Sequence, residues 1–425
     1  MRKKACRLDF LATSPFRQDN SHADAQNILQ TMKTTTRKRV LFIASQPFFQ
    51  RRGSPIRLGF DLMSLAQLGY KVDFLTLPIG ERKEVEDVTI IRAPNIFHAK
   101  EISIGPSPLK LAFDFLIFWM ALYRVIRYRY AVVHGVEDCG IIALFCARVG
   151  RARAVFERHS DPASYKKKKG IGNLIVKLYA AVEHFVIRHA DAVIGTGAGL
   201  VENATKIRRD GRACQINDIP SSLADADPAT TAEIRKKHTR SPSDIIIGYV
   251  GSFAVYQGID LLFGAIPIVA KAVPNARFAI IGGSLAEIAE RRAQLAAAGC
   301  PEAVTFLGFI DPDKLPNYLS SFDILLSPRI SGMNTPLKLL DYLKAKVPIV
   351  ATDCDANRLI LDKTTAELTP LTPEGFAEGI IRLCNDRVRR DALTGAGQEI
   401  LREHHSFPVF KDGLRKCYEY VLNVK

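Results

Sequence analysis

The sequence has no long uncharged apolar run, which removes one class of protein at once. No stretch reaches the roughly 18 apolar residues expected of a membrane-spanning helix. The nearest approach is residues 109–126, LKLAFDFLIFWMALYRVI. This run contains Lys110, Asp114 and Arg124, so it predicts a buried helix rather than a membrane span.

Cysteine pairs are also lacking. No two cysteines have CxxC spacing, and no His/Cys cluster follows the spacing of a zinc site. The eight cysteines are scattered, at positions 6, 139, 146, 214, 300, 354, 384 and 417. Scattered thiols are typical of reduced, cytosolic proteins. We therefore expect a cytoplasmic protein with no structural zinc site.

The first 36 residues lack the apolar core of about 7–15 residues that a signal peptide needs. They carry six Lys or Arg and three Asp or Glu. We expect residues 1–36 to be a flexible N-terminal arm outside the fold. Met32 is an alternative natural start, because it lies just before the first convincing strand.

The net charge of +15 favours anionic partners such as nucleic acid, an acidic membrane surface or phosphorylated ligands. The basic residues are dispersed and no known nucleic-acid module is visible, so nucleic acid is not expected as a partner. The run KKKK at residues 166–169 has two interpretations. It is either a solvated charge run or a contact with anionic lipid headgroups, which would place the protein peripherally at the inner face of the membrane.

Apolar runs alternate with helical spacing along the chain, and 425 residues are enough for two domains. Residues 39–45 and 71–77 predict strands on either side of a loop and a helix at 58–68. Such a βαβ unit implies a parallel sheet. Further strands are predicted at 131–134, 154–158 and 192–195, with helices at 140–149 and 174–190 between them.

A second series of the same kind begins near Asp244. It predicts strands at 245–250, 277–281, 304–307, 324–327 and 348–351, with helices at 259–273, 315–320 and 336–343. The polar residues 221–243 predict a linker. The fold class is therefore α/β, with two facing doubly wound Rossmann-like domains at 37–220 and 244–405. Ligands are expected at the carboxyl ends of the strands.

Each predicted domain has a glycine loop after its first strand. The first loop holds Gly53 and Ser54, and the second runs from Gly251 to Gly258. Neither is a G-x-G-x-x-G or P-loop motif. Each is either a plain turn or a loop whose N–H groups and following helix dipole hold a phosphate.

Three other side chains are candidates for chemistry. His159 follows a strand in FERHSDP, which places it in the crevice region, although a lone histidine there is more often a satisfied polar loop residue, and the same holds for His134. Lys338 and Asp341 are three residues apart, which places them on one helix face. A lysine suits phosphate and a carboxylate suits ribose hydroxyls, but an exposed ion pair is the alternative.

Taken in order, these segments resemble the family-4 retaining glycosyltransferases of the GT-B fold. The resemblance covers about residues 38–420 and rests on an ordered set of pieces. They are ADAVI at 190–194, VGS through QGID at 250–260, IGGS at 281–284, VTFLG at 304–308, FDILLSP at 322–328 and YLKAKVPIVAT at 342–352.

This resemblance implies a nucleotide-sugar donor in the C-terminal domain and a saccharide or lipid-linked acceptor in the N-terminal domain. It implies retention at the anomeric carbon without a metal or other cofactor. Residues 406–425 are expected to form a helix that returns to the N-terminal domain. His159 is expected near the reacting centre of the donor sugar. The expected donor-binding residues are Gly53, Ser54, Gly251, Ser252, Gln257, Gly283, Phe309, Arg329, Asn334, Thr335 and Asp341.

The sequence departs from the family pattern at two places. The family has two Glu separated by seven residues, where this chain has Met333 and Asp341. The basic pair that grips the diphosphate in the family is Ser252 and Gln257 here. We expect Lys338 to supply the missing positive charge, which would make it a catalytic residue together with His159.

Two functions follow from these observations. The first is an active glycosyltransferase in surface polysaccharide or glycolipid biosynthesis, which His159, Lys338 and Asp341 favour. The second is a catalytically weak or inactive protein that binds a nucleotide sugar or partners another transferase, which Met333 favours.

Overall fold

The computed structural model describes residues 37–46, 48, 53–80, 84–102, 107–160, 171–208, 210–332 and 335–423. The chain divides into Met1–Lys38 and Arg39–Lys425, and the elements below all belong to the second unit. The N-terminal arm expected at residues 1–36, the alternative start Met32 and the KKKK run lie outside the described residues.

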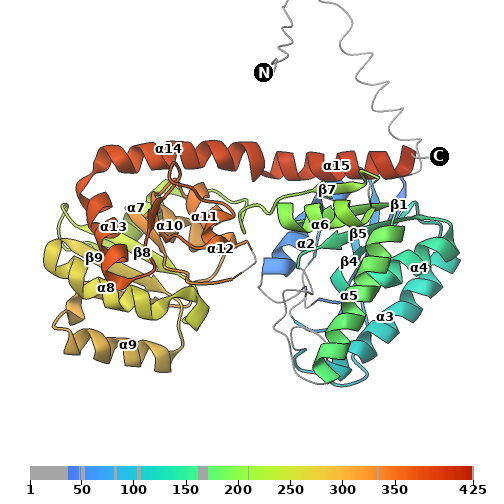
Figure 1. Cartoon of the computed structure of the whole chain (residues 1–425), viewed down its shortest axis with the longest axis horizontal. Helices are drawn as coiled ribbons and strands as arrows, with labels where there is room; N and C mark the ends of the chain where they lie inside the picture. The colour runs from blue at the N-terminus through green and yellow to red at the C-terminus, as the bar shows by residue number, and fades with distance from the viewer. Residues whose placement is uncertain are drawn as a thin grey trace, which may run out of the picture. The chain divides into compact units, whose positions relative to one another are not determined.

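The first sheet is parallel and, in the described part of the chain, has the strand order β3-β2-β1-β4-β5-β6-β7 (Figure 1). The order reverses between β1 and β4, the position where open α/β sheets bind ligands. Its strands are β1 (Arg39–Ala44), β2 (Lys71–Thr76), β3 (Val88–Arg92), β4 (Val132–Val136), β5 (Arg153–Arg158), β6 (Ala192–Gly195) and β7 (Ala213–Gln215).

Helices cover both faces of this sheet. They are α2 (Gly53–Gln67), α3 (Pro108–Arg127), α4 (Gly140–Gly150), α5 (Ile171–His189) and α6 (Ala198–Arg208), with a short 3-10 helix η1 (Glu137–Cys139) after β4. A doubly wound, Rossmann-like domain is therefore confirmed for this half of the chain. Among the described residues, none of the helices is both long and apolar enough to traverse a bilayer.

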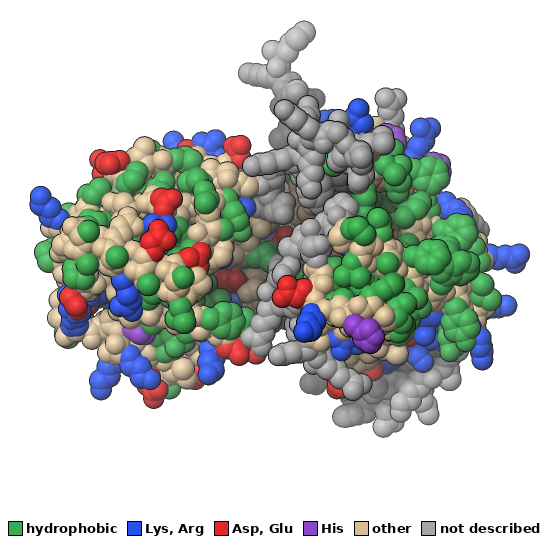
Figure 2. Space-filling model, turned by 90° about the horizontal axis from the view of Figure 1, so that it is seen from below, with side chains coloured by type: hydrophobic (Ala, Val, Ile, Leu, Met, Phe, Trp, Pro, Cys, Tyr) green, Lys and Arg blue, Asp and Glu red, His purple; other side chains and the backbone are tan. Residues whose placement is uncertain are grey.

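The expectation of a buried helix at residues 109–126 is wrong in one respect. Helix α3 buries Phe113, Ile117 and Val125, but Phe115 and Trp119 on its other side are exposed. Figure 2 shows hydrophobic side chains gathered on the right-hand part of the molecule, where Figure 1 places α3, α4 and α5. The helix is apolar almost all round, so its sequence did not indicate which side its neighbours would leave uncovered.

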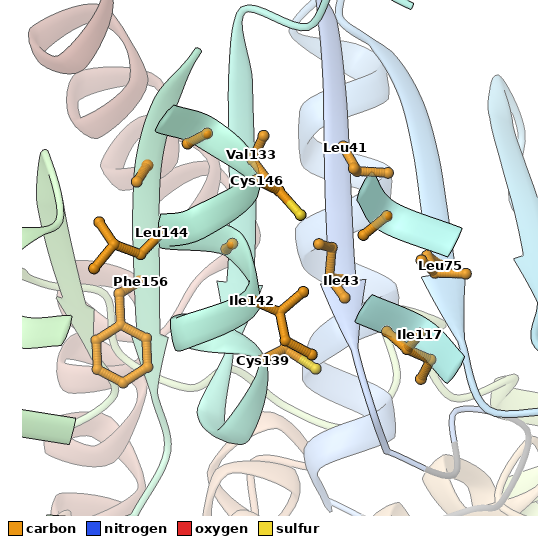
Figure 3. Packing of buried hydrophobic residues seen from close by; sticks show 14 of the residues in the cluster. Leu41, Ile43, Leu75, Ile117, Val133, Cys139, Ile142, Leu144, Cys146 and Phe156 are labelled. Atoms are coloured by element: carbon orange, nitrogen blue, oxygen red, sulfur yellow. The ribbon is translucent and has the colours of Figure 1, made fainter. Parts of the chain in front are cut away.

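The core of the first domain lies on the two faces of its sheet because successive strand residues point to opposite sides. Figure 3 shows Leu41, Ile43 and Leu75 facing Ile117 of α3 and Ile142 of α4. The residues that alternate with them pack on the other face, in a cluster that includes Val40, Phe42, Val72 and Phe74.

The second sheet is also parallel, with the order β10-β9-β8-β11-β12-β13 among the described residues. Its strands are β8 (Ile245–Val250), β9 (Ala276–Ile281), β10 (Val304–Gly308), β11 (Ile324–Ser327), β12 (Ile349–Thr352) and β13 (Glu367–Thr369). The second Rossmann-like domain is thereby confirmed. Around it lie α8 (Ile259–Ala272), α9 (Leu285–Ala297), α10 (Leu315–Ser320), α11 (Leu337–Lys344), α12 (Asp355–Arg358), α13 (Pro373–Asn385) and α14 (Arg387–His404), with 3-10 helices η3 (Val255–Gln257) and η4 (Pro301–Ala303).

The polar segment 221–243 is not a continuous linker, because it contains helix α7 (Pro228–His238). The side chain of Asp227 accepts a hydrogen bond from the Thr230 amide and caps this helix, and Pro228 occupies its first position. Both are helix start signals, so the helix was predictable from these residues. The low apolar content of the segment concealed it.

The last helix, α15 (Phe407–Asn423), packs against α2, β5 and β7 of the first domain. Its residues Phe410, Leu414 and Tyr418 are buried in the cluster around Phe42. The chain turns between α14 and α15 at His405, whose Nδ1 lies 2.7 Å from the carbonyl oxygen of Asp218. The C-terminal helix is thus part of the core of the N-terminal domain.

Candidate functional site

Glu157, near the carboxyl end of β5, is the centre of a buried charge cluster in the first domain. Its Oε1 accepts a hydrogen bond from Arg57 Nε at 2.6 Å and lies 2.8 Å from His159 Nε2. Its Oε2 lies 3.1 Å from His134 Nε2, and His134 Nδ1 lies 2.8 Å from the Tyr418 hydroxyl. A chain of polar contacts therefore connects the C-terminal helix to His159.

The two buried carboxyl groups of this cluster have pKa values shifted in opposite directions. Burial alone would raise the pKa of Glu157, but the positive charge of Arg57, together with the adjacent rings of His134 and His159, outweighs burial and holds that pKa well below its usual range. Asp61 of α2 is fully buried, and burial and the negative charge of Glu157 raise its pKa well above its usual range. Arg57 is therefore buried between carboxyl groups, and Glu157 is the fully buried one that it contacts directly.

His159 is fixed by two carboxylates. Its ring faces Glu157, and its backbone N–H donates to Glu137 Oε1 at 2.5 Å. The Ser160 hydroxyl donates to Glu137 Oε2 at 3.0 Å. Glu137 has a φ of 52°, a left-handed conformation that is uncommon outside glycine, at the end of β4.

The other ring nitrogen of His159, Nδ1, has different surroundings from Nε2. Among the residues that the structure describes, Nδ1 is buried and has no hydrogen-bond partner. If Nε2 carries a proton toward Glu157, a neutral ring leaves Nδ1 as an acceptor. A hydroxyl group is the complementary ligand. The expectation that His159 has a polar role at the carboxyl edge of the sheet is compatible with this geometry.

Gly53 and Ser54 are the first two residues of α2, which follows β1 and its loop. The sequence predictions missed Arg57 in the first turn of the same helix. Besides Glu157, its guanidinium contacts Asp218 Oδ1 at 2.9 Å. The isolated arginine within an apolar helix face was the available signal, but its partners are 100 and 161 residues away along the chain.

In the second domain, Lys338 lies in the first turn of α11 and points toward the loop after β8. Its Nζ donates a hydrogen bond to Gln257 Oε1 at 2.9 Å and lies 4.7 Å from the centre of the Tyr249 ring. Burial, with a smaller contribution from the positive charge of Arg329, lowers the pKa of Lys338 to about 7. An anion placed beside this ammonium would favour its charged form.

The loop after β8 is held tightly against the end of β11. Gly258 has a φ of 70°, and a Cβ atom there would lie 1.9 Å from the Pro328 carbonyl oxygen. The backbone N–H of Ile330 donates a hydrogen bond to the carbonyl oxygen of Tyr256 at 3.1 Å. The loop therefore brings Gly251 close to Lys338, whose Nζ would be 3.6 Å from a Cβ at that glycine.

Of two predicted donor-binding residues in this loop, Gln257 contacts Lys338 directly and Ser252 is bonded to Tyr249, whose ring lies beside Lys338. Gln257 accepts its hydrogen bond, and the Ser252 carbonyl accepts one from the Tyr249 hydroxyl at 2.9 Å. The adjoining turn after β9 is equally close-packed, because a Cβ at Gly282 would lie 2.0 Å from the Gly251 carbonyl oxygen. Gly283 follows with a φ of 81° against the Phe253 ring.

The remaining predicted donor-binding residues have varied environments. Arg329 is buried, donates to the Ser331 carbonyl at 2.8 Å and lies over the Tyr256 ring; burial lowers its pKa. Phe309 is 78% exposed just after β10. Thr335 immediately precedes Pro336 and α11. Asn334 and Met333 lie outside the described residues.

Asp341 does not share a partner with Lys338, although both are on α11. Its Oδ1 accepts from the Ser221 backbone N–H at 2.6 Å, and its Oδ2 accepts from the Ser221 hydroxyl at 2.8 Å. Burial raises its pKa to about 6 despite these bonds. The spacing suggested one shared ligand, but the carboxylate instead joins α11 to the start of the interdomain segment.

The two halves of the candidate site offer different chemistry. The second domain supplies a lysine beside glycine-rich turns, a combination suited to phosphate groups. The first domain supplies a buried, oriented imidazole suited to a neutral hydroxyl. In the described part of the chain, no group of three or more His, Cys, Asp or Glu could hold a metal ion.

Comparisons with known families assign both halves of the chain. The family model described as glycosyl transferase 4-like domain matches residues 62–216, and the model described as glycosyl transferases group 1 matches residues 244–386. Together the two matches cover well over half of the chain.

Curated relatives match only part of their own length. The phosphatidyl-myo-inositol mannosyltransferase of Mycobacterium leprae is 28% identical over 169 residues, which are 39% of this chain and 43% of that protein. The 2-deoxystreptamine N-acetyl-D-glucosaminyltransferase of Streptomyces fradiae is 25% identical over 53% of this chain and 54% of that protein. The matched region thus spans about half the length of these relatives or less.

Solved structures resemble the chain over most of its length. Sucrose-phosphate synthase from Thermosynechococcus elongatus has a TM-score of 0.69 at 18% identity, over 90% of this chain and 98% of that protein. WaaG, a glycosyltransferase involved in lipopolysaccharide biosynthesis, has a TM-score of 0.64 at 14% identity. The likeness covers 89% of this chain and 99% of that protein. At such low identity these likenesses support the GT-B fold alone.

Proposed function

The chain belongs to the glycosyl transferases group 1 family, of GT-B type, and we propose that it transfers a sugar from a nucleotide-sugar donor to a saccharide or glycolipid acceptor. The activities for which its relatives are named are sugar transfers to inositol lipids and to 2-deoxystreptamine. A role in surface polysaccharide or glycolipid biosynthesis fits that range of acceptors. The observation that carries the proposal is the position of Lys338 beside the loop after β8.

The donor diphosphate binds beside Lys338 in this proposal. The leaving nucleotide diphosphate gains negative charge as the bond to the sugar breaks, so a preorganised cation nearby stabilises the transition state more than the ground state. Lys338 already faces Gln257 and the Gly251 turn, and it lies at the N-terminal end of α11, where the helix dipole adds to its charge. These groups replace the basic pair that the loop lacks.

His159 contacts the donor sugar, and its buried Nδ1 supports this role. The acceptor binds in the first domain. We further propose that the sugar keeps its anomeric configuration and that the reaction uses no metal or other cofactor. Lys338 and the loop N–H groups would then provide the charge compensation on the diphosphate.

A second candidate function is a protein that binds the nucleotide sugar with little or no turnover. The observation that favours it is the pKa of about 7 at Lys338, which leaves much of this lysine uncharged near neutral pH until an anion binds. The presence of Ser252 and Gln257 in place of the usual basic pair also favours a binding protein with little or no turnover.

Nucleotide release from a panel of UDP-, GDP- and ADP-sugars separates the two functions. A transferase releases nucleotide with at least one donor, and release accelerates when a saccharide or lipid-linked acceptor is added. A binding protein shows thermal stabilisation by a donor without release. If no donor gives either thermal stabilisation or nucleotide release, that result would contradict both functions.

A further inference from the structure

Helix α3 presents a row of large apolar side chains to solvent. Leu111, Phe115, Trp119 and Tyr123 recur every four residues, and each is more than half exposed. A stripe with this spacing lies along one side of a helix. The opposite side, with Phe113 and Ile117, already fills the core. The row is therefore additional to what the fold of the domain requires.

The row continues onto the two neighbouring helices. Phe118 lies between Trp119 and Phe145 of α4, with ring centroids 5.4 and 5.5 Å away. Phe145 is half exposed, and α4 packs in turn on α5, where Leu178 and Phe185 are also exposed. We name the exposed apolar residues of α3, α4 and α5 the apolar face; Figure 2 shows the hydrophobic side chains gathered there.

The exposed charges that the described parts of α3, α4 and α5 carry have one sign. Arg127, Arg151, Lys177 and Arg188 are exposed on or beside the three helices. Among the described side chains of α3, α4 and α5, none of the exposed ones is acidic. Their two acids, Asp114 and Glu183, are mostly buried and pair with Lys110 and Arg158.

This combination decides which partner fits. A second copy of the chain meeting the same face would oppose one basic rim to another, with no exposed acid among the described side chains of these helices to compensate. An anionic bilayer offers the complement of both features. Acyl chains and the interfacial region accept Leu, Phe, Trp and Tyr, and acidic headgroups attract arginine and lysine.

We propose that the apolar face docks in the headgroup region of an anionic lipid bilayer, with α3 lying in the membrane plane. The helix begins beside the catalytic edge of its domain, since Lys110 donates to Ser45, at the end of β1, at 3.1 Å. Docking through α3 would hold the domain that binds the acceptor at the lipid surface. The inference goes beyond the proposed transfer reaction and does not depend on turnover.

Trp119 allows a direct test because it is the only tryptophan in the chain. The full-length protein is mixed with vesicles of phosphatidylcholine alone, or of phosphatidylcholine with an equal part of phosphatidylglycerol. With the anionic vesicles we expect a blue shift of tryptophan emission, quenching by brominated lipid and flotation of the protein with the vesicles. With the neutral vesicles we expect at least about tenfold weaker binding.

Variants identify the face that binds. Phe115→Ser with Tyr123→Ser should weaken binding to the anionic vesicles at least about tenfold, because two large apolar side chains no longer leave water. Arg127→Gln with Arg151→Gln should weaken binding and reduce its dependence on salt. The matched control is Leu285→Ser on α9, which is 89% exposed in the other domain and should leave binding unchanged. Thermal melts verify that each variant is folded.

Three outcomes would overturn the proposal. They are the absence of a blue shift with anionic vesicles, equal loss of binding in the Leu285→Ser control, and burial of Trp119 in a dimer that forms without lipid. These outcomes are measured by tryptophan emission, by vesicle binding and by the mass of the protein in solution, whereas the proposed transfer is measured by nucleotide release. The failure of one inference is therefore distinguishable from the failure of the other.

Discussion

The imidazole Nε2 of His159 lies 2.8 Å from Oε1 of Glu157, a carboxylate that is completely buried. The same oxygen accepts the Arg57 hydrogen bond, so the histidine is oriented by a fixed ion pair rather than by solvent. Its other nitrogen, Nδ1, remains buried without a partner among the described residues. This relationship gives His159 a defined orientation before any ligand arrives.

His159→Ala should lower kcat by about 10²-fold, the scale of one lost preorganised group, while nucleotide affinity changes little. The reason is that His159 is proposed to contact the sugar and not the diphosphate. Steady-state kinetics and calorimetric titration with the free nucleotide measure the two effects. His404→Ala, at an exposed histidine of α14, is the matched control and should behave as wild type. Loss of nucleotide affinity with unchanged kcat would contradict this role.

Glu157→Gln should also lower kcat, because Glu157 acts only by positioning the ring of His159. Glutamine keeps the size of the side chain but removes the charge that faces Arg57, so the ring of His159 loses its fixed partner. We expect a lower kcat with an unchanged dissociation constant for the nucleotide. The expected stability loss is measured separately by thermal melts. An equal fall in nucleotide affinity would mean that the whole domain is disturbed, not only the histidine.

Lys338→Ala should lower kcat by about 10²–10³, because no second basic residue of the loop can meet the charge of the leaving diphosphate. The measurement is the rate of nucleotide release with the donor found by screening. Lys271→Ala, at an exposed lysine of α8, is the control for loss of a positive charge. An unchanged kcat/KM in Lys338→Ala would mean that the diphosphate is held elsewhere.

The affinity for a nucleoside diphosphate should fall as pH rises above about 7. Burial lowers the pKa of Lys338 to about 7, and the diphosphate binds its ammonium form, so the bound pKa is higher and binding takes up a proton. Calorimetric titration of UDP and of GDP, in buffers of different ionisation enthalpy between pH 7 and 9, measures this uptake. Lys338→Met should bind more weakly and show no proton uptake, and a retained pH dependence would contradict the assignment.

The parts of the fold that the sequence predicted are those with unbroken apolar runs. Strands such as β1 and β8 have four or five buried residues in succession, so a buried strand is the single interpretation of their sequences. Strands β3 and β7 were missed because β3 is only partly buried and β7 has three residues. Short, half-buried strands depend on their neighbours more than on their own sequence.

The candidate site was predictable only where a residue has a local motif. Lys338 follows a recognisable strand and loop, whereas Glu157 gains its importance from Arg57, a hundred positions earlier in the chain. The exposure of Trp119 was equally hidden, because α3 is apolar on nearly every side and only packing decides which side is covered. Long-range partners and uncovered faces therefore required the structure.

Asp341 is the residue for which the sequence and the structure suggest different roles. The sequence pattern predicts a contact with the ribose of the donor, but both carboxylate oxygens accept hydrogen bonds from Ser221. Asparagine could keep both contacts, since its oxygen can accept from the Ser221 N–H and its amide can donate to the Ser221 hydroxyl. Asp341→Asn therefore separates the two roles.

If Asp341 only anchors the interdomain segment, Asp341→Asn should stabilise the protein at neutral pH. Burial raises the folded pKa to about 6 from the ordinary 3.8, so the folded state holds a proton that the unfolded chain releases, and stability falls as pH rises between these values. Removing the charge should recover up to about 3 kcal/mol at pH 7 and nothing below pH ~3.8. Thermal melts at pH 7 and pH 4 measure the difference, and donor KM should stay unchanged. A raised donor KM without a gain in stability would instead support the ribose contact, because a buried anchor has no reason to change substrate affinity alone.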